Sequence, residues 1–153
     1  MVIGYGSPIR GDDAIGPLAA DRLERAGVPE GVEVVSRHIL TAELVADLVA
    51  HDRVVFLDAA VDAAPGEVRC RRIAPDATAI STMAHFLDPR ELLAWCETLY
   101  GRFPETFLVS AGGASFGYAN YSLTPVAEAA IEPMLDRVRR LIDRPAGPRS
   151  DPS

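Results

Sequence analysis

Short apolar runs alternate with amphipathic segments along the chain, and each kind predicts a different element. Residues 54–57 and 107–109 are apolar at every position, which is typical of strands buried on both faces of a parallel sheet. Over residues 15–26, apolar side chains instead recur at helical spacing until Gly27 and Pro29 end the pattern. The other predicted elements are strands at residues 2–3, 32–35 and 67–73, and helices that begin after Thr41, at Asp88 and at Thr124.

The order of these elements predicts the fold class. Strands that alternate with helices are joined by right-handed crossovers into a mostly parallel sheet with helices on both faces. Residues 67–73 alternate charged with apolar side chains, as a half-exposed antiparallel edge strand would. We therefore expect an α/β protein, a three-layer α/β/α sandwich whose twisted, mostly parallel sheet has about five strands, one of them an antiparallel edge strand. One domain is expected over residues 1–143, followed by a disordered tail at residues 144–153.

Composition and charge argue against several classes of function. The chain has 153 residues, is 48% hydrophobic and carries a formal net charge of −7, so we expect neither nucleic-acid binding nor a membrane span. Lysine is absent, which excludes Schiff-base chemistry and a P-loop lysine. Cys70 and Cys96 fit no zinc motif, and no export signal is evident. These features lead us to expect reduced thiols in a cytoplasmic protein.

The segment GYGSPIRGDDAIG, residues 4–16, is richer in glycine and acid than a simple turn requires. Its glycines miss the G-x-G-x-x-G spacing, so a dinucleotide site is poorly supported. In a sheet of order 2-1-3, ligands collect at the carboxyl ends of the first and third strands, where the strand order reverses. Asp13 is expected to face Asp58 there, because Asp58 ends the third strand, and residues 110–116 leave the last strand at the same edge. The alternative role for Asp12 and Asp13 is helix capping.

His85 is a third candidate ligand, in a loop just before the helix predicted to begin at Asp88. A histidine and two carboxylates suit a divalent metal with open positions, although a lone loop histidine is commonly solvated instead. A nucleophilic protease is not indicated, because Cys96 falls inside a helical pattern and Cys70 on a strand, and neither has an evident paired base.

Four motifs together resemble the nickel-iron hydrogenase maturation endopeptidases. They are GYGSPIRGDDAIGP, VVFLDAA, HFLDP at residues 85–89, and GGASF followed by SLTP, in the family's order and spacing. The resemblance covers the chain up to about residue 142 and implies a hydrogenase maturation protease-like domain. It implies a cytoplasmic endopeptidase that removes the C-terminal extension of the hydrogenase large-subunit precursor once nickel is inserted. By position it places the catalytic and metal-binding residues at Asp13, Asp58 and His85.

The resemblance also implies what binds at this site. The expected metal is nickel carried by the substrate, with no tightly bound organic cofactor, and the expected partner is the large-subunit precursor, bound by a monomer. Gly4, Gly6, Gly11 and Gly16 then shape the loop that holds the first acid. The two acids and the imidazole could bind the substrate's nickel or activate a water, and the sequence leaves both roles open. Two alternative functions are a non-catalytic nickel-dependent maturation checkpoint and a flavodoxin-like ligand-binding protein.

Three features differ from the usual pattern of the family. Ser7 stands where the family usually has Asn, and Met83 and Ala84 replace more polar residues before the histidine. The first strand starts only three residues before Gly4. We therefore expect either that the start codon was assigned too late or that the protein is a weakened homologue.

Overall fold

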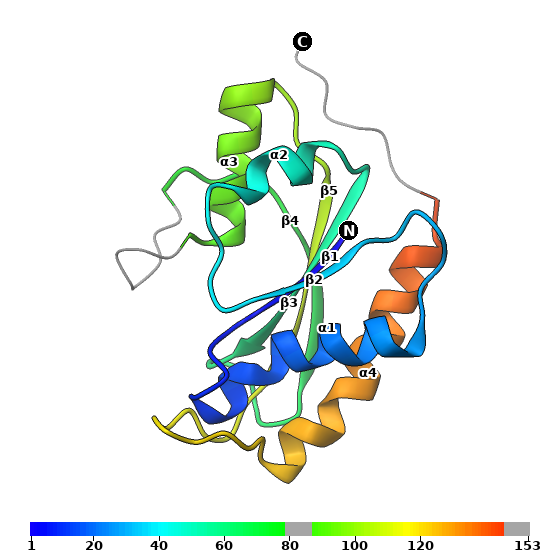
Figure 1. Ribbon diagram of the computed structural model, residues 1–153. Coiled ribbons are helices and arrows are strands. Elements are labelled where there is room, and N and C mark those ends of the chain that lie inside the picture. The colour runs from blue at the N-terminus through cyan, green and yellow to red at the C-terminus, as the bar shows by residue number, and fades with distance from the viewer. Residues whose placement is uncertain (79–86, 146–153) are drawn as a thin grey trace.

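The computed structural model describes residues 1–78 and 87–145 and contains one mixed sheet (Figure 1). The strands run in the order β2-β1-β3-β5-β4, and every neighbouring pair is parallel except β4 with β5. The strands are β1 (Val2–Tyr5), β2 (Val34–Arg37), β3 (Arg53–Ala60), β4 (Val68–Ile73) and β5 (Glu105–Gly112). The first three strands have the order 2-1-3 that we assumed for the switch point, and the predicted antiparallel edge strand is confirmed.

Helices cover both faces of the sheet, as Figure 1 shows. The helical elements are η1 (Gly11–Ala14, a 3-10 helix), α1 (Ile15–Ala26), α2 (Leu44–Val49), α3 (Pro89–Tyr100) and α4 (Pro125–Asp143). On one face, α1 and α4 pack around Leu23, Leu57 and Met134. On the other, α2 and α3 pack around Phe56 and Leu92. The predicted three-layer α/β/α sandwich is therefore confirmed, while residues 146–153 of the predicted tail lie outside the described residues.

Two of the three predicted helix caps are confirmed. The carboxylate of Asp88 accepts a hydrogen bond from the Arg90 N–H at 2.8 Å, and the Thr124 hydroxyl accepts one from Ala127 at 3.4 Å. The prediction for Thr41 is wrong, because α2 begins three residues later, at Leu44. The backbone turns first, and the Leu44 N–H donates to the carbonyl of Thr41 rather than to its side chain.

Several strand boundaries also differ from the sequence prediction: β1 and β5 extend beyond residues 2–3 and 107–109, and β4 begins one residue later, at Val68. The second strand begins at Val34 rather than at residue 32. Asp58 does not end the third strand, because β3 continues to Ala60. The reason is the partner strand: β5 is equally long, and it pairs with β3 as far as Ala60 and Gly112. Asp58 therefore lies inside the β3–β5 ladder, where it pairs with Ser110, one residue beyond the last residue of β3 that pairs with β1.

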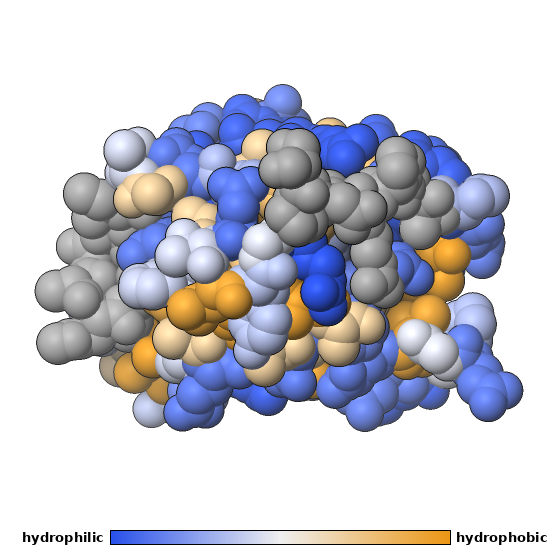
Figure 2. All heavy atoms as spheres, turned by 90° about the horizontal axis from the view of Figure 1, so that it is seen from above, coloured by the Kyte–Doolittle hydropathy of each residue, from blue (hydrophilic) through white to orange (hydrophobic). Residues whose placement is uncertain are grey.

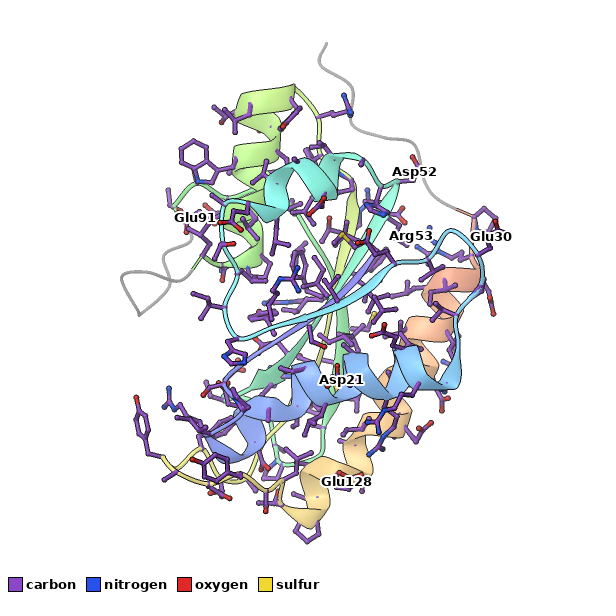
Figure 3. All side chains as sticks on the ribbon, in the orientation of Figure 1. Asp21, Glu30, Asp52, Arg53, Glu91 and Glu128 are labelled. Carbon is purple, nitrogen blue, oxygen red and sulfur yellow. The ribbon has the colours of Figure 1, made fainter. Side chains whose placement is uncertain are left out.

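Arg53 (labelled in Figure 3) forms hydrogen bonds that link β3 to β5 and to the end of α4, at the end of the sheet that lies away from η1. Its Nε donates to the Glu105 carboxylate at 2.6 Å, and the two side chains are only 11% and 4% exposed. Its other nitrogens donate to the carbonyls of Leu141, Arg144 and Pro145. One guanidinium thus joins β3, β5 and the C-terminal end of α4.

We expect Arg53→Gln to lower the free energy of unfolding by about 2 kcal/mol, because it leaves the buried Glu105 carboxylate with a weaker partner and frees carbonyls of α4. The control is Arg72→Gln, since Arg72 is 61% exposed and lies 3.8 Å from the same carboxylate. That control should cost about 0.5 kcal/mol or less. Urea unfolding of both variants measures the difference, and equal losses would contradict this account of Arg53.

Hydrophilic residues cover most of the surface seen in Figure 2, and hydrophobic ones form small patches between them. Among the helices formed by the described residues, none has the length and apolar character that a membrane-spanning segment requires.

Candidate active site

The candidate site lies at the carboxyl ends of β1 and β3, where the strand order reverses. The chain leaves β1 toward α1 on one face, and it enters β3 from α2 on the other face. Such a switch point opens a crevice between the two crossovers. Gly16 brings the start of α1 directly against it, because a side chain there would lie 2.4 Å from the Leu57 carbonyl oxygen and 2.5 Å from that of Tyr5.

Asp58 projects from β3 toward the face covered by α2 and α3, and it is held by two donors. The Tyr5 hydroxyl donates to Oδ2 at 2.8 Å, and the backbone N–H of Ala59 donates to Oδ1 at 2.7 Å. Burial raises the pKa of Asp58 to about 7, and the charges of Asp13 and Asp88 act in the same direction, while the two hydrogen bonds oppose it. A carboxyl group whose pKa lies near neutral pH can bind a cation in its charged form and can accept or donate a proton.

Asp13 lies in η1 and belongs to the same electrostatic site, since its charge contributes to the raised pKa of Asp58. Its Oδ2 accepts a hydrogen bond from the Ser7 N–H at 2.7 Å. Gly6 makes the required turn, with a φ of 148° and no space for a Cβ, which would lie 2.0 Å from the Asp13 carbonyl oxygen. The glycine-rich loop therefore folds closely around the first acid.

Asp12 has a different role from its neighbour, although the sequence suggests helix capping for both acids. It is fully buried, and its carboxylate accepts hydrogen bonds from Ala114, Ser115 and Thr124. Burial acts to raise the pKa of Asp12, but these hydrogen bonds outweigh it and lower the pKa below the usual value. Asp12 therefore ties the first loop to the loop after β5 and to the start of α4. The predicted convergence of these loops on one edge of the sheet is confirmed.

The structure brings two of the three predicted site residues, Asp13 and Asp58, to this edge. His85 lies outside the described residues. Within residues 1–78 and 87–145, no group of three His, Cys, Asp or Glu side chains is arranged to hold a metal ion. The three-ligand assignment that includes His85 remains a prediction.

The cysteines are both free thiols. Cys96 is buried in α3, and burial raises the pKa of its thiol to about 11. A thiol of this kind is protonated near neutral pH, and the thiolate is the nucleophilic form. The prediction that Cys96 is no nucleophile is consistent with this burial.

A groove of about 270 Å³ runs from Asp58 across the sheet toward β4. We call it the Asp58 groove. Leu108 and Ser110 of β5 lie on its floor, together with Ile73, and Tyr5 and Pro89 are among its walls. Its charged lining residues are Asp58, Asp62, Asp88, Arg69, Arg71 and Arg90. Asp58 lines the groove, whereas Asp13 does not. Because the groove extends well beyond Asp58, it offers room for a chain segment rather than for an ion alone.

The fold and the site together define the chain as an α/β/α protein with an acid pair at its switch point. No family model matches the chain. It is 27% identical to the Hydrogenase 2 maturation protease of Escherichia coli strain K12, over an alignment of 145 residues that covers 90% of this chain and 87% of the relative.

Solved structures agree with that relative. The hydrogenase maturating endopeptidase HybD from E. coli superimposes with a TM-score of 0.76 at 28% identity, over 92% of this chain and 90% of that one. The [NiFe] hydrogenase maturation protease HycI from Thermococcus kodakarensis superimposes with a TM-score of 0.72 at 22% identity, over 94% and 91% of the two chains, and shows the shared fold. The resemblance to the hydrogenase maturation endopeptidases is confirmed.

Proposed function

We propose that this protein is an endopeptidase that removes the C-terminal extension of a nickel-loaded hydrogenase large-subunit precursor. The observation that carries the proposal is the meeting of Asp13 and Asp58 at the switch point. The Ser7 N–H holds Asp13, the Tyr5 hydroxyl and the Ala59 N–H hold Asp58, and the charge of Asp13 raises the pKa of Asp58. The similarity to proteins named as hydrogenase maturation proteases supports the same reading.

Placing Asp13 and Asp58 close together destabilises the fold, and a purely structural role for the two acids would not require it. Like charges close together in a partly buried site destabilise each other, and no arginine forms an ion pair with either acid among the described residues. A divalent cation would relieve this repulsion. We infer that the substrate's nickel does so, with His85 as a third ligand.

Hydrolysis adds one water across the scissile C–N bond: the water oxygen bonds to the carbonyl carbon, and the leaving nitrogen takes a proton. In this proposal Asp58 lies at the end of a groove that can hold the substrate chain, so it is the acid placed to orient the water or to accept its proton. Asp13, outside the groove, serves to bind the metal. Recognition of the bound nickel would make cleavage wait for nickel insertion.

We expect the purified protein to shorten nickel-loaded precursor and to leave nickel-free precursor intact, as measured by intact-mass spectrometry. The mass lost should equal that of the C-terminal extension. Binding of the nickel-loaded precursor without any cleavage would instead support a checkpoint role. A protein that takes up a flavin or nucleotide and ignores both precursors would support the flavodoxin-like alternative, and cutting of both precursors alike would contradict nickel recognition.

A further inference from the structure

The charges that line the Asp58 groove are mostly neutralised within the protein. Arg69 forms ion pairs with Asp62 and Glu67, each at 3.3 Å. Arg90 forms one with Asp88 at 3.2 Å. Within residues 1–78 and 87–145, these pairs leave two charged groups of the groove without an ion pair: Asp58 at one side and Arg71 at the other.

Arg71 is exposed, and its side chain makes no hydrogen bond or ion pair with any part of the chain that the structure describes. Its direction is fixed by the pleat of β4, because alternate residues of a strand point to the same face. Arg69, Arg71 and Ile73 accordingly all line the groove. Arg72 points to the opposite face, toward Glu105 and away from the groove.

The sheet register gives the separation between the two unpaired groups. Asp58 pairs with Ser110, which pairs with Arg69, and Arg71 lies two residues further along β4, opposite Leu108. Two interstrand steps and two residues along a strand place the Cα atoms of Asp58 and Arg71 about 12 Å apart. An extended peptide covers this distance with about three to four residues. The floor between them includes the apolar side chain of Leu108 and the hydroxyl of Ser110.

We propose that the Asp58 groove binds an extended segment of the substrate and that Arg71 pairs with an acidic side chain of that segment, about three or four residues from the scissile bond. This inference rests on the proposed endopeptidase function and names a feature of its substrate. A guanidinium matches a carboxylate with two parallel hydrogen bonds, and no carboxylate in the described part of the chain pairs with Arg71. Because the chain is acidic overall, with a net charge of −7, an unpaired cation inside the groove also distinguishes this surface from its surroundings.

The test compares Arg71→Gln with Arg72→Gln in steady-state cleavage of a nickel-loaded precursor that the wild-type protein cuts. Both variants remove one arginine from adjacent exposed positions of one strand, but only Arg71 faces the groove. We expect Arg71→Gln to raise KM about tenfold with kcat changed by about twofold or less, because the lost ion pair forms on substrate binding. Arg72→Gln should keep the wild-type KM, and 0.5 M salt should narrow the difference between Arg71→Gln and the wild type.

A charge-reversal experiment identifies the acidic residue of the substrate that pairs with Arg71. Each acidic residue within about four positions of the scissile bond is replaced by Arg in turn, and each precursor is offered to the wild-type protein and to Arg71→Glu. One precursor should be cut poorly by the wild type and well by Arg71→Glu. If no precursor is rescued and Arg71→Gln keeps the wild-type KM, Arg71 is a solvated surface residue and the inference is wrong. The proposed function is judged separately, because it fails only if the wild-type protein cuts no nickel-loaded precursor.

Discussion

Replacing either Asp13 or Asp58 by Asn should lower the rate of cleavage of nickel-loaded precursor by about 100-fold or more, with little loss of stability. Asn keeps the shape of the side chain and one acceptor oxygen, but it lacks the negative charge that a divalent cation requires. For Asp13, the Ser7 N–H keeps an acceptor, so the free energy of unfolding should change by about 1 kcal/mol or less. Single-turnover cleavage and urea unfolding measure the two quantities.

Asp58→Asn adds a pH signature that separates a functional acid from a structural one. The raised pKa of Asp58 means that the folded state holds a proton that the unfolded state releases between about pH 4 and pH 7. Stability of the wild-type protein therefore falls as the pH rises through this window, and Asp58→Asn removes that contribution to the fall. At pH 8 the variant should be as stable as the wild type or more stable, and yet inactive.

His85→Ala should also lose cleavage, because the third ligand of the proposed nickel site is removed. Full activity of Asp13→Asn and Asp58→Asn together would contradict the proposed roles of both acids. Full activity of His85→Ala alone would contradict only the assignment of His85.

The sequence predicts the large elements of this fold well, for reasons that are local. Helix α1 ends where Gly27 and Pro29 interrupt its pattern, and α3 starts where Asp88 and Pro89 supply a cap and a first residue without a donor. The charged and apolar alternation of β4 identifies an edge strand, because only one of its faces is well covered. The crossover rules allow the strand order 2-1-3 without requiring it, and it is the structure that shows this order.

The sequence predicts less where a residue's role depends on its partner. Asp58 appears to end a strand only because the apolar run stops there, and its place inside β3 is set by the length of β5. The contact of Tyr5 with Asp58 joins positions 53 residues apart, and no periodicity indicates it. Arg71 looks like its neighbours Arg69 and Arg72 in the sequence. Only the structure shows that those two have acidic partners within the fold.

The two adjacent acids of the first loop show this limit most directly. Both Asp12 and Asp13 suit a helix start, and in the sequence only the resemblance to the family assigns the functional role to Asp13. The structure gives this assignment a physical basis. Asp12 is fully buried among hydrogen-bond donors, whereas the Asp13 carboxylate accepts one hydrogen bond from Ser7 and its charge acts on Asp58. This difference leads to opposite expectations for the same substitution.

Asp12→Asn should lower the free energy of unfolding by about 3 kcal/mol or more, well beyond the effect of Asp13→Asn. The Asp12 carboxylate accepts four hydrogen bonds at 2.7 to 3.1 Å, from the N–H groups of Ala114, Ser115 and Thr124 and from the Thr124 hydroxyl. An amide group has only one acceptor oxygen, and its NH₂ would face donors that are buried with it. The loss should be measured by urea unfolding.

The pH dependence of this difference gives a second readout. Because the hydrogen bonds lower the pKa of Asp12 in the folded state, its contribution to stability is complete above the unfolded pKa of about 3.9 and is lost as the pH falls through the folded pKa. The stability gap between the wild type and Asp12→Asn should therefore be constant from about pH 6 upward and should shrink in acid. A gap of about 1 kcal/mol or less at neutral pH would mean that Asp12 does not hold the first loop to the loop after β5 and to the start of α4. The candidate site would then depend on other contacts for its shape.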